Sequence, residues 1–263
     1  MGGRLVVTCP RRSSNAHSPG AEAWSFDGDD RIGVLLLHGF TGSPASMRPW
    51  GEKFAERGWT VRVPRLPGHG TRWQDMNITQ WQDWYSEADR NLRELSNRCA
   101  RVFVCGLSMG GALTLRLAED HGEDIAGIVL VNAAVHTERK DRHLLPIIKH
   151  FVGSFPGISN DIAKPGANEV AYDRTPLKAA HSMMEMWSIV KKDIALVRQP
   201  VLLFRSEQDN VVEASNAEWI LTHVGSHDTE EVVLANSYHV ATLDHDAPLI
   251  EEASAAFIER LAG

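Results

Sequence analysis

The amino-acid sequence predicts an α/β protein with a mostly parallel central sheet, helices on both faces and an inserted cap. Short apolar runs of strand length alternate with longer helical patterns along the chain. This alternation is typical of parallel strands that are joined by crossover helices. The chain has 263 residues, of which 43% are hydrophobic, and this is enough for one substantial domain.

The individual elements follow from these patterns. Apolar runs predict strands at residues 32–37, 60–63, 101–105, 127–131, 201–204 and 232–234. Helices are expected at 44–57, at 111–120 and from about Pro248 to Leu261. A further helix, which Asn77 or Thr79 would cap, has an apolar stripe that runs from Trp81 to Leu95.

The interval 134–199 breaks the alternation, because a single crossover helix needs far fewer residues. We expect residues 1–20 to form a loosely ordered tail, 21–133 and 200–263 to form the core, and 134–199 to form a cap with a return helix. A cap would exclude water and gate substrate entry. We expect its apolar residues to form a small satellite core, with at least two of them lining an acyl-chain pocket. These residues are Leu144, Leu145, Ile147, Ile148, Phe151, Val152, Phe155, Ile158 and Ile162.

One pentapeptide carries the chemistry. Gly106-Leu107-Ser108-Met109-Gly110 lies between a predicted strand and a predicted helix. A G-x-S-x-G sequence in this context forms a sharp turn that exposes the serine hydroxyl, while its glycines keep other side chains away. The positive end of the next helix lies beside that hydroxyl. By itself the pentapeptide also marks ordinary tight turns, but together with two further signals it makes Ser108 a candidate nucleophile for acyl transfer.

The first further signal lies upstream, where the strand at 32–37 ends in His38-Gly39-Phe40-Thr41-Gly42. In enzymes with this serine turn, the loop after an early strand supplies one backbone N–H of the oxyanion hole. The residue after the nucleophile supplies the other. We therefore assign the N–H groups of Phe40 and Met109 as the donors. The alternative is an ordinary strand exit at which glycine permits the turn.

The second further signal is the order of acid and base along the chain. The strand at 201–204 leads into a loop with Asp209, and the strand at 232–234 leads into a loop with His239. The order serine, acid, histidine is the one that accompanies this serine turn. His239 would take the proton from Ser108, and Asp209 would hold the imidazole in the correct tautomer.

Other residues compete for these two roles. Glu207 is the nearest rival to Asp209, being two residues away. Among the other histidines, His223 and His227 are expected at the surface, and His245 is expected near the start of the last helix. His69, in a Pro-Gly-His-Gly turn, is expected to fix that loop.

Composition excludes several classes of function. The net charge of −7 and the lack of a basic run give no footprint for nucleic acid or anionic lipid. The chain has three cysteines, Cys9, Cys99 and Cys105, which do not form a disulfide framework and favour the reducing cytoplasm. No cysteine or histidine spacing resembles a metal site, and no metal or organic cofactor is expected. No apolar run approaches the roughly 20 residues that cross a bilayer, and the start of the chain lacks a signal-peptide pattern.

Four segments together resemble the bacterial monoacylglycerol lipases and related carboxylesterases of the α/β-hydrolase fold. They are residues 35–44, 67–71, 106–111 and 236–244, and the resemblance extends over about 30–262. It implies the triad Ser108, Asp209 and His239, with oxyanion donors at Phe40 and Met109. It also implies that Glu169 accepts hydrogen bonds from the glycerol hydroxyls and that Ile158 faces the acyl channel.

The resemblance implies hydrolysis of monoacylglycerols to glycerol and fatty acid through an acyl-enzyme on Ser108. A general carboxylesterase for short- to medium-chain esters is the alternative, and a thioesterase or C–C bond hydrolase stays open, because fold does not fix substrate. A non-catalytic ligand-binding protein usually lacks a triad residue, whereas this chain has all three. The expected partner is a small ester, with no stable membrane insertion; transient contact of the cap with a lipid surface stays open. The sequence does not predict an oligomeric state.

Overall fold

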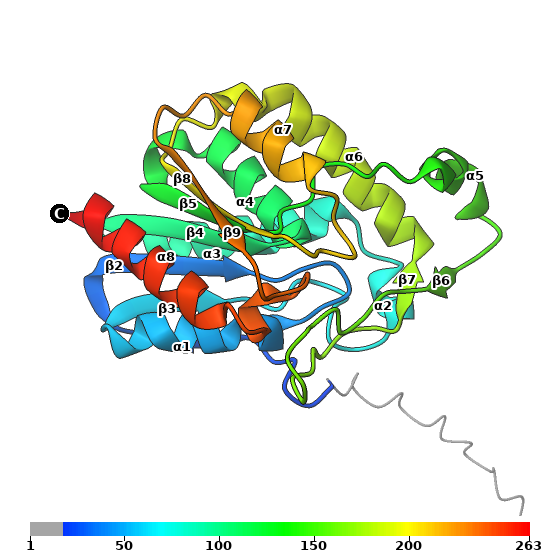
Figure 1. Cartoon of the computed structure of the whole chain (residues 1–263), viewed down its shortest axis with the longest axis horizontal. Coiled ribbons are helices and arrows are strands. Elements are labelled where there is room, and N and C mark those ends of the chain that lie inside the picture. The colour runs from blue at the N-terminus through cyan, green and yellow to red at the C-terminus, as the bar shows by residue number, and fades with distance from the viewer. Residues whose placement is uncertain (1–17) are drawn as a thin grey trace, which may run out of the picture.

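The computed structural model describes residues 18–263, which form a seven-stranded sheet in the order β1-β3-β2-β4-β5-β8-β9 (Figure 1). β1 pairs antiparallel with β3, and all other neighbours in this sheet are parallel. The mostly parallel sheet that the sequence predicts is therefore confirmed. The strands are β1 (Trp24–Phe26), β2 (Asp29–Leu37), β3 (Trp59–Val63), β4 (Arg101–Leu107), β5 (Gly127–Val131), β8 (Val201–Ser206) and β9 (Thr229–Leu234).

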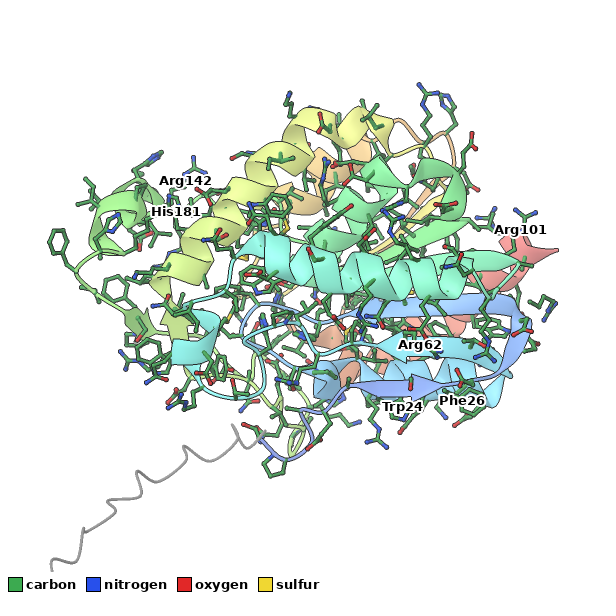
Figure 2. All side chains as sticks on the ribbon, turned by 180° about the vertical axis from the view of Figure 1, so that it is seen from behind. Trp24, Phe26, Arg62, Arg101, Arg142 and His181 are labelled. Atoms are coloured by element: carbon green, nitrogen blue, oxygen red, sulfur yellow. The ribbon has the colours of Figure 1, made fainter. Side chains whose placement is uncertain are left out.

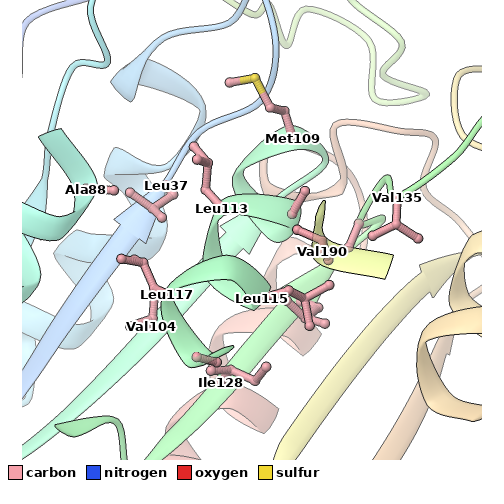
Figure 3. Close-up of a cluster of buried hydrophobic side chains, with 14 of the residues drawn as sticks. Leu37, Ala88, Val104, Met109, Leu113, Leu115, Leu117, Ile128, Val135 and Val190 are labelled. Atoms are coloured by element: carbon pink, nitrogen blue, oxygen red, sulfur yellow. The ribbon is translucent and has the colours of Figure 1, made fainter. Parts of the chain in front are cut away.

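Helices cover both faces because the central strands are apolar on both sides. In β2, Leu35 and Leu37 face one core while Val34 and Leu36 face the other, as the two-residue period of a strand requires. The first core lies under α3 (Trp81–Ser96), α4 (Met109–Asp120), α6 (Leu177–Asp193) and α7 (Ser215–His223). Figure 3 shows the side chains that α4 contributes to it. The second core lies under α1 (Arg48–Glu56) and α8 (Ala247–Ala262).

The two sheet edges are protected in different ways. β9 carries charged residues, including Glu230 and Glu231, and such charges discourage pairing with another chain. At the other edge, β1 is only three residues long, and a very short edge strand offers little for another chain to pair with. Arg62 of the neighbouring β3 forms ion pairs with Asp27 and Glu94, at 2.8 Å each, and lies near Trp24 and Phe26 of β1 in Figure 2.

Two predicted helix starts are wrong. The segment expected as a helix over 44–57 begins with a 3₁₀ turn at Pro44–Ser46, and α1 follows it. Neither Asn77 nor Thr79 caps α3. Its cap is Gln80, whose N–H donates to Asp83 Oδ2 at 2.8 Å in a capping box. Thr79 instead donates to Met76 O at 2.8 Å, at the end of the short helix α2 (Trp73–Met76).

The inserted segment lies between β5 and β8. It contains α5 (Leu145–Ile148), a small hairpin of β6 (Ser154–Pro156) and β7 (Arg174–Pro176), and the long return helix α6. In Figure 1, α5 and the hairpin project at one end of the molecule, while α6 runs back over the sheet. Figure 2 shows Arg142 and His181 at this same end.

The structure describes only part of the predicted N-terminal tail and two of the three cysteines. Of the predicted tail, residues 1–17 and Cys9 lie outside them, and Ser18 N–H donates to Gly70 O at 2.9 Å. Cys99 and Cys105 are buried free thiols. Within residues 18–263, no helix has both the length and the apolar character to cross a bilayer.

Candidate active site

Ser108 occupies a strained turn between β4 and α4. Its backbone has φ 56° and ψ −116°, in a region that residues with a side chain rarely adopt. Ser108 N–H donates to Val131 O at 2.9 Å, which ties the turn to the neighbouring strand. The turn places Ser108 at the amino end of α4, where the helix dipole is positive.

The glycines on either side of Ser108 are required by close packing. A Cβ on Gly106 would lie 2.3 Å from Gly110 O, and a Cβ on Gly110 would lie 2.0 Å from Leu37 O. Both distances are far below van der Waals contact, so no side chain fits at either position. The serine turn is therefore pressed directly against the end of β2.

The loop after β2 lies against this turn. A Cβ on Gly39 would lie 3.4 Å from Ser108 Cβ, in ordinary contact. Among the hydrogen bonds of residues 18–263, neither Phe40 N–H nor Met109 N–H has an acceptor. The side chain of Met109 is buried in the core (Figure 3), so only its backbone is available to the site. Two backbone N–H groups without an acceptor thus lie next to the serine turn, one on the loop after β2 and one at the start of α4.

His38 holds this loop in place as a neutral imidazole. Burial lowers its pKa to about 4. Its Nδ1–H donates to Gly39 O at 3.0 Å, and its Nε2 accepts from Leu66 N–H at 3.2 Å. His38 is thus a structural support of the loop that carries Phe40.

The structure brings Asp209 and His239 together. His239 Nδ1 lies 2.8 Å from Asp209 Oδ2, and both side chains are almost fully buried. Asp209 Oδ1 accepts from the N–H groups of Val211 and Val212, at 2.8 Å each, which fixes the carboxylate. The rival Glu207 is exposed.

Surrounding charges set the protonation of His239. Burial acts to lower its pKa, but the hydrogen bond and charge of Asp209, with the charges of Glu169 and Asp161, more than offset this effect. The pKa of His239 is therefore raised above its ordinary value of 6.5. No hydrogen bond joins Ser108 Oγ to the imidazole within the described part of the chain; both side chains border one cavity.

The other histidines lie elsewhere. His223, His227 and His245 are exposed. His69 is fully buried, and its Nδ1 lies 3.1 Å from Pro67 O, so it braces its own loop as expected.

A cavity of about 480 Å³ lies between the core and the inserted segment. Its wall includes Ser108, His239 and Phe40 from the core, and Ile158 and Glu169 from the insertion. The apolar part of the wall comes largely from the insertion and from α6, with Leu145, Ile148, Phe155, Met183, Met184 and Trp187.

The nine apolar residues of the insertion divide into three groups, one of which is Ile162 alone, partly buried against the second core. Leu145, Ile148, Phe155 and Ile158 line the cavity, so more than two do so. The expected satellite core is wrong for Leu144, Ile147, Phe151 and Val152, because their side chains are exposed.

Glu169 of the inserted segment lines the cavity. A Cβ on Gly42 would lie 2.6 Å from Glu169 Oε1, so this carboxyl rests directly on the loop after β2. Within residues 18–263 its side chain has no hydrogen-bond partner. Burial raises the pKa of Glu169 to about 7, and the nearby His239 partly opposes this effect. The carboxyl is therefore free to bind a polar group in the cavity.

Two polar supports of the histidine loop were missed by the sequence reasoning. Asn132, with φ 45°, donates from Nδ2 to His239 O at 2.8 Å and to Ser206 Oγ at 2.9 Å. Asp161, in the inserted segment, accepts from His239 N–H at 3.1 Å. Asn132 follows a strand directly, which is a usable sequence signal, whereas nothing in the pattern around Asp161 connects it with residue 239.

Residues 18–263 contain no group of three or more His, Cys, Asp or Glu residues arranged to hold a metal ion.

Comparisons with known proteins identify a family and several relatives. The family Hydrolase_4, described as "Serine aminopeptidase, S33", matches residues 28–246. The thermostable monoacylglycerol lipase of Bacillus sp. (strain H-257) is 43% identical over 239 residues, covering 88% of this chain and 92% of the relative. The carboxylesterase of Bacillus subtilis (strain 168) is 27% identical over 242 residues, covering 90% and 96%. A solved structure described for the metagenome-derived lipolytic enzymes LipS and LipT superposes with a TM-score of 0.90 at 42% identity, covering 93% of this chain and 100% of that one.

Proposed function

This chain belongs to the Hydrolase_4 family, and on that premise we propose that it hydrolyses monoacylglycerols to glycerol and free fatty acid. The observation that carries the proposal is the His239–Asp209 pair, joined at 2.8 Å, in the same cavity wall as the strained Ser108. The 43% identity to a relative named thermostable monoacylglycerol lipase supports the choice of substrate.

The reaction runs through an acyl-enzyme. Ser108 Oγ attacks the ester carbonyl while His239 takes its proton, and Asp209 stabilises the resulting imidazolium. The negative charge on the carbonyl oxygen is stabilised by the N–H groups of Phe40 and Met109, each contributing about 3 kcal/mol to lowering the barrier. His239 then protonates the departing glycerol oxygen. Water, deprotonated by His239, attacks the acyl-enzyme and releases the fatty acid.

Apolar residues and the carboxyl of Glu169 in the cavity wall suit the two parts of a monoacylglycerol. The apolar side chains of the insertion and α6 would hold the acyl chain, with Ile158 among them. Glu169 would accept hydrogen bonds from the glycerol hydroxyls, because its carboxyl borders the cavity without a partner among the described residues. A buried polar group without a partner disfavours an apolar ligand at that point, and this gives the site selectivity for a hydroxylated head group.

A hydrolysis panel tests this proposal. Monoacylglycerols, diacylglycerols, p-nitrophenyl esters of increasing chain length and an aminoacyl p-nitroanilide are compared, with Ser108→Ala as the control and a fluorophosphonate label to count reactive serines. We expect the highest kcat/KM with monoacylglycerols of medium to long chain. Equal or higher kcat/KM with short p-nitrophenyl esters would contradict the proposed substrate.

A general carboxylesterase is the second candidate. The alignment with the Bacillus subtilis carboxylesterase, which covers 90% of this chain and 96% of the relative, favours it. Preference for short-chain esters in the panel, with no effect of the glycerol head group, would support this candidate instead.

We further propose transient contact of the cap with a lipid surface, and a cytoplasmic location. Phe151 and Ile147 are 84% and 62% exposed, and they belong to the same segment as the cavity-lining Ile148 and Phe155. An exposed apolar group beside a substrate cavity suits a substrate that is drawn from a lipid phase.

The proposed cytoplasmic location rests on the sparse cysteines and on the free thiols of Cys99 and Cys105.

A further inference from the structure

We propose that Asp161 of the inserted segment is a positioning residue, which holds the loops of His239 and Asp209 at a fixed separation. This inference rests on the proposed function, because it concerns how the same site is held ready for the reaction. Asp161 belongs to the segment between the hairpin strands β6 and β7, far along the chain from both loops.

Four hydrogen bonds define the clamp. Asp161 Oδ2 accepts from His239 N–H at 3.1 Å and from Asn210 N–H at 3.2 Å. Its Oδ1 accepts from Asn210 Nδ2 at 2.8 Å, and its backbone carbonyl accepts from Val240 N–H at 3.1 Å. One residue therefore contacts the histidine itself and the residue next to the aspartate. Any separation of the two loops would break at least one of these bonds.

The segment around Asp161 is itself anchored. Asn160 has φ 56°, a left-handed conformation that asparagine tolerates better than most residues. The buried Asp244 accepts from Ala163 N–H at 2.7 Å, from Lys164 N–H at 2.8 Å and from Tyr238 N–H at 2.9 Å. The segment is thus bound to the histidine loop at two places, so Asp161 is a rigid support and not a flexible contact.

The charge of Asp161 acts on His239 as well. Three carboxyl groups face this imidazole: Asp209 from the loop after β8, and Asp161 and Glu169 from the inserted segment. A negative charge near the imidazole stabilises the imidazolium that forms when Ser108 is deprotonated. Asp161 has no contact with Ser108, so it acts through His239 and Asn210.

Two variants of Asp161 separate its positioning of the two loops from the effect of its charge on His239. Asp161→Ala removes both, and Asp161→Asn removes the charge while its amide oxygen still accepts from the two backbone N–H groups. We expect Asp161→Ala to lower kcat about 10- to 100-fold at every pH, because small displacements of catalytic groups have effects of this size. KM is expected to stay within about threefold of the wild-type value. The readouts are kcat and KM for a p-nitrophenyl ester between pH 5 and 9, per serine titrated with fluorophosphonate.

Asp161→Asn has a different expected signature. Its kcat should stay within about threefold of wild type on the alkaline plateau of the pH profile, where the imidazole is deprotonated in both proteins. The acidic limb of its kcat/KM profile should move to lower pH by roughly half a pH unit, because one negative charge is lost. NMR titration of the His239 imidazole checks the same shift without substrate.

Asp246→Ala is the matched control. Asp246 clamps the same loop in the same way, since it accepts from Asn236 N–H at 2.8 Å and from Asn236 Nδ2 at 3.0 Å, but it does not contact the residues of the pair. We expect Asp246→Ala to lower the melting temperature without changing kcat per titrated serine. If Asp161→Ala behaves in this same way, the positioning role is overturned.

The remaining outcomes also decide the proposal. If Asp161→Ala does not fold, Asn210→Ala removes one of the four bonds of the clamp and should give a smaller fall in kcat. An unchanged kcat in that variant overturns the positioning role. An unchanged pKa of His239 in Asp161→Asn overturns the effect of the charge.

If the wild type hydrolyses p-nitrophenyl esters but not monoacylglycerols, the proposed substrate is contradicted, and the p-nitrophenyl ester measurements still decide the role of Asp161. Failure on every ester contradicts the proposed function, and the NMR titration then tests Asp161 alone.

Discussion

At the scale of single residues, the site depends on a serine in an unfavourable conformation. A residue with a side chain at such φ and ψ angles costs about 1–3 kcal/mol, and the surrounding structure must hold it there. The backbone of β2 and the bond from Ser108 N–H to Val131 O supply that restraint. The strain exposes the hydroxyl at the amino end of α4, where the proposed reaction needs it.

Two substitutions of Ser108 test this view. We expect Ser108→Ala to lower kcat/KM about 10⁴- to 10⁶-fold while the fold stays intact. Ser108→Gly should be equally inactive but unfold at a higher temperature than Ser108→Ala, because glycine adopts this conformation without strain. Activity assays and thermal unfolding of both variants check the two expectations. Near-wild-type activity of Ser108→Ala would refute the nucleophile.

The charge of Asp209 predicts a pH dependence. His239 must be neutral to act as a base, so kcat/KM is lost as pH falls through its pKa, which is raised above 6.5. In Asp209→Asn the partner charge is gone, so the acidic limb should lie at lower pH than in the wild type. The plateau should fall roughly 10³- to 10⁴-fold, because the tautomer is no longer fixed. Glu207→Gln is the control, and an equal effect of this change would point to Glu207 as the acid.

Glu169 allows a test of the head-group site. We expect Glu169→Ala to lower kcat/KM for monoacylglycerols about 10-fold, the effect of losing hydrogen bonds worth about 1.5 kcal/mol. Turnover of a simple alkyl ester of the same acyl chain should change much less, because it has no hydroxyls to bind. Equal losses on both substrates would show that Glu169 does not recognise glycerol.

At the scale of elements, β2, β4 and α4 form one unit around the serine turn. α4 is buried along almost its whole length, and Gly110 lets it approach the end of β2. The geometry of the site is therefore inseparable from the packing of these elements.

Gly110→Ala is expected to disrupt this unit. Its Cβ would lie 2.0 Å from Leu37 O, so the strand and the helix must move apart. We expect a loss of about 3 kcal/mol in the free energy of unfolding, the upper range for overpacking, together with most of the activity. Denaturant unfolding measures the loss. Gly122→Ala is the control, because a Cβ there meets no atom closer than 3.8 Å; equal stability of both variants would contradict the argument.

The length of an element decided whether the sequence predicted it. Each strand that the sequence predicted has five or more residues, as in β2 and β5, which is long enough for the period or burial of a strand to appear. β1, β6 and β7 have three residues each, and α2 and α5 have four, which is too short for any period to appear. The start of α3 was misplaced because several polar residues before Trp81 can cap a helix, and only the geometry of Gln80 and Asp83 selects one.

At the scale of the whole molecule, the inserted segment forms part of the cavity wall and also exposes apolar side chains to solvent. Phe151, at 84% exposure, lies outside the cavity on this segment. The core supplies the proposed chemistry, and the insertion would supply the acyl-chain wall, Glu169 and the clamp of Asp161.

Phe151→Asp tests whether these exposed side chains meet a lipid surface. We expect hydrolysis of monoacylglycerol in vesicles to fall several-fold, because an apolar anchor worth roughly 2 kcal/mol is replaced by a charge. Hydrolysis of soluble p-nitrophenyl acetate should not change. Leu196→Asp, in the 3₁₀ turn Ile194–Leu196 that follows α6 and 55% exposed, is the control. Equal rates of Phe151→Asp and wild type on vesicles would exclude this contact.

The sequence by itself determined the parallel sheet, through the alternation of strand and helix patterns. It also determined the serine turn and the order of Ser108, Asp209 and His239, because each of these residues follows closely after a predicted buried strand. Only the tertiary structure decided which apolar residues of the insertion face the cavity, that Glu169 rests on Gly42, and that Asp161 joins the two loops. The physical reason is that these contacts connect segments far apart in the chain. No local period or spacing encodes them, and they form only when the folded core brings those segments together.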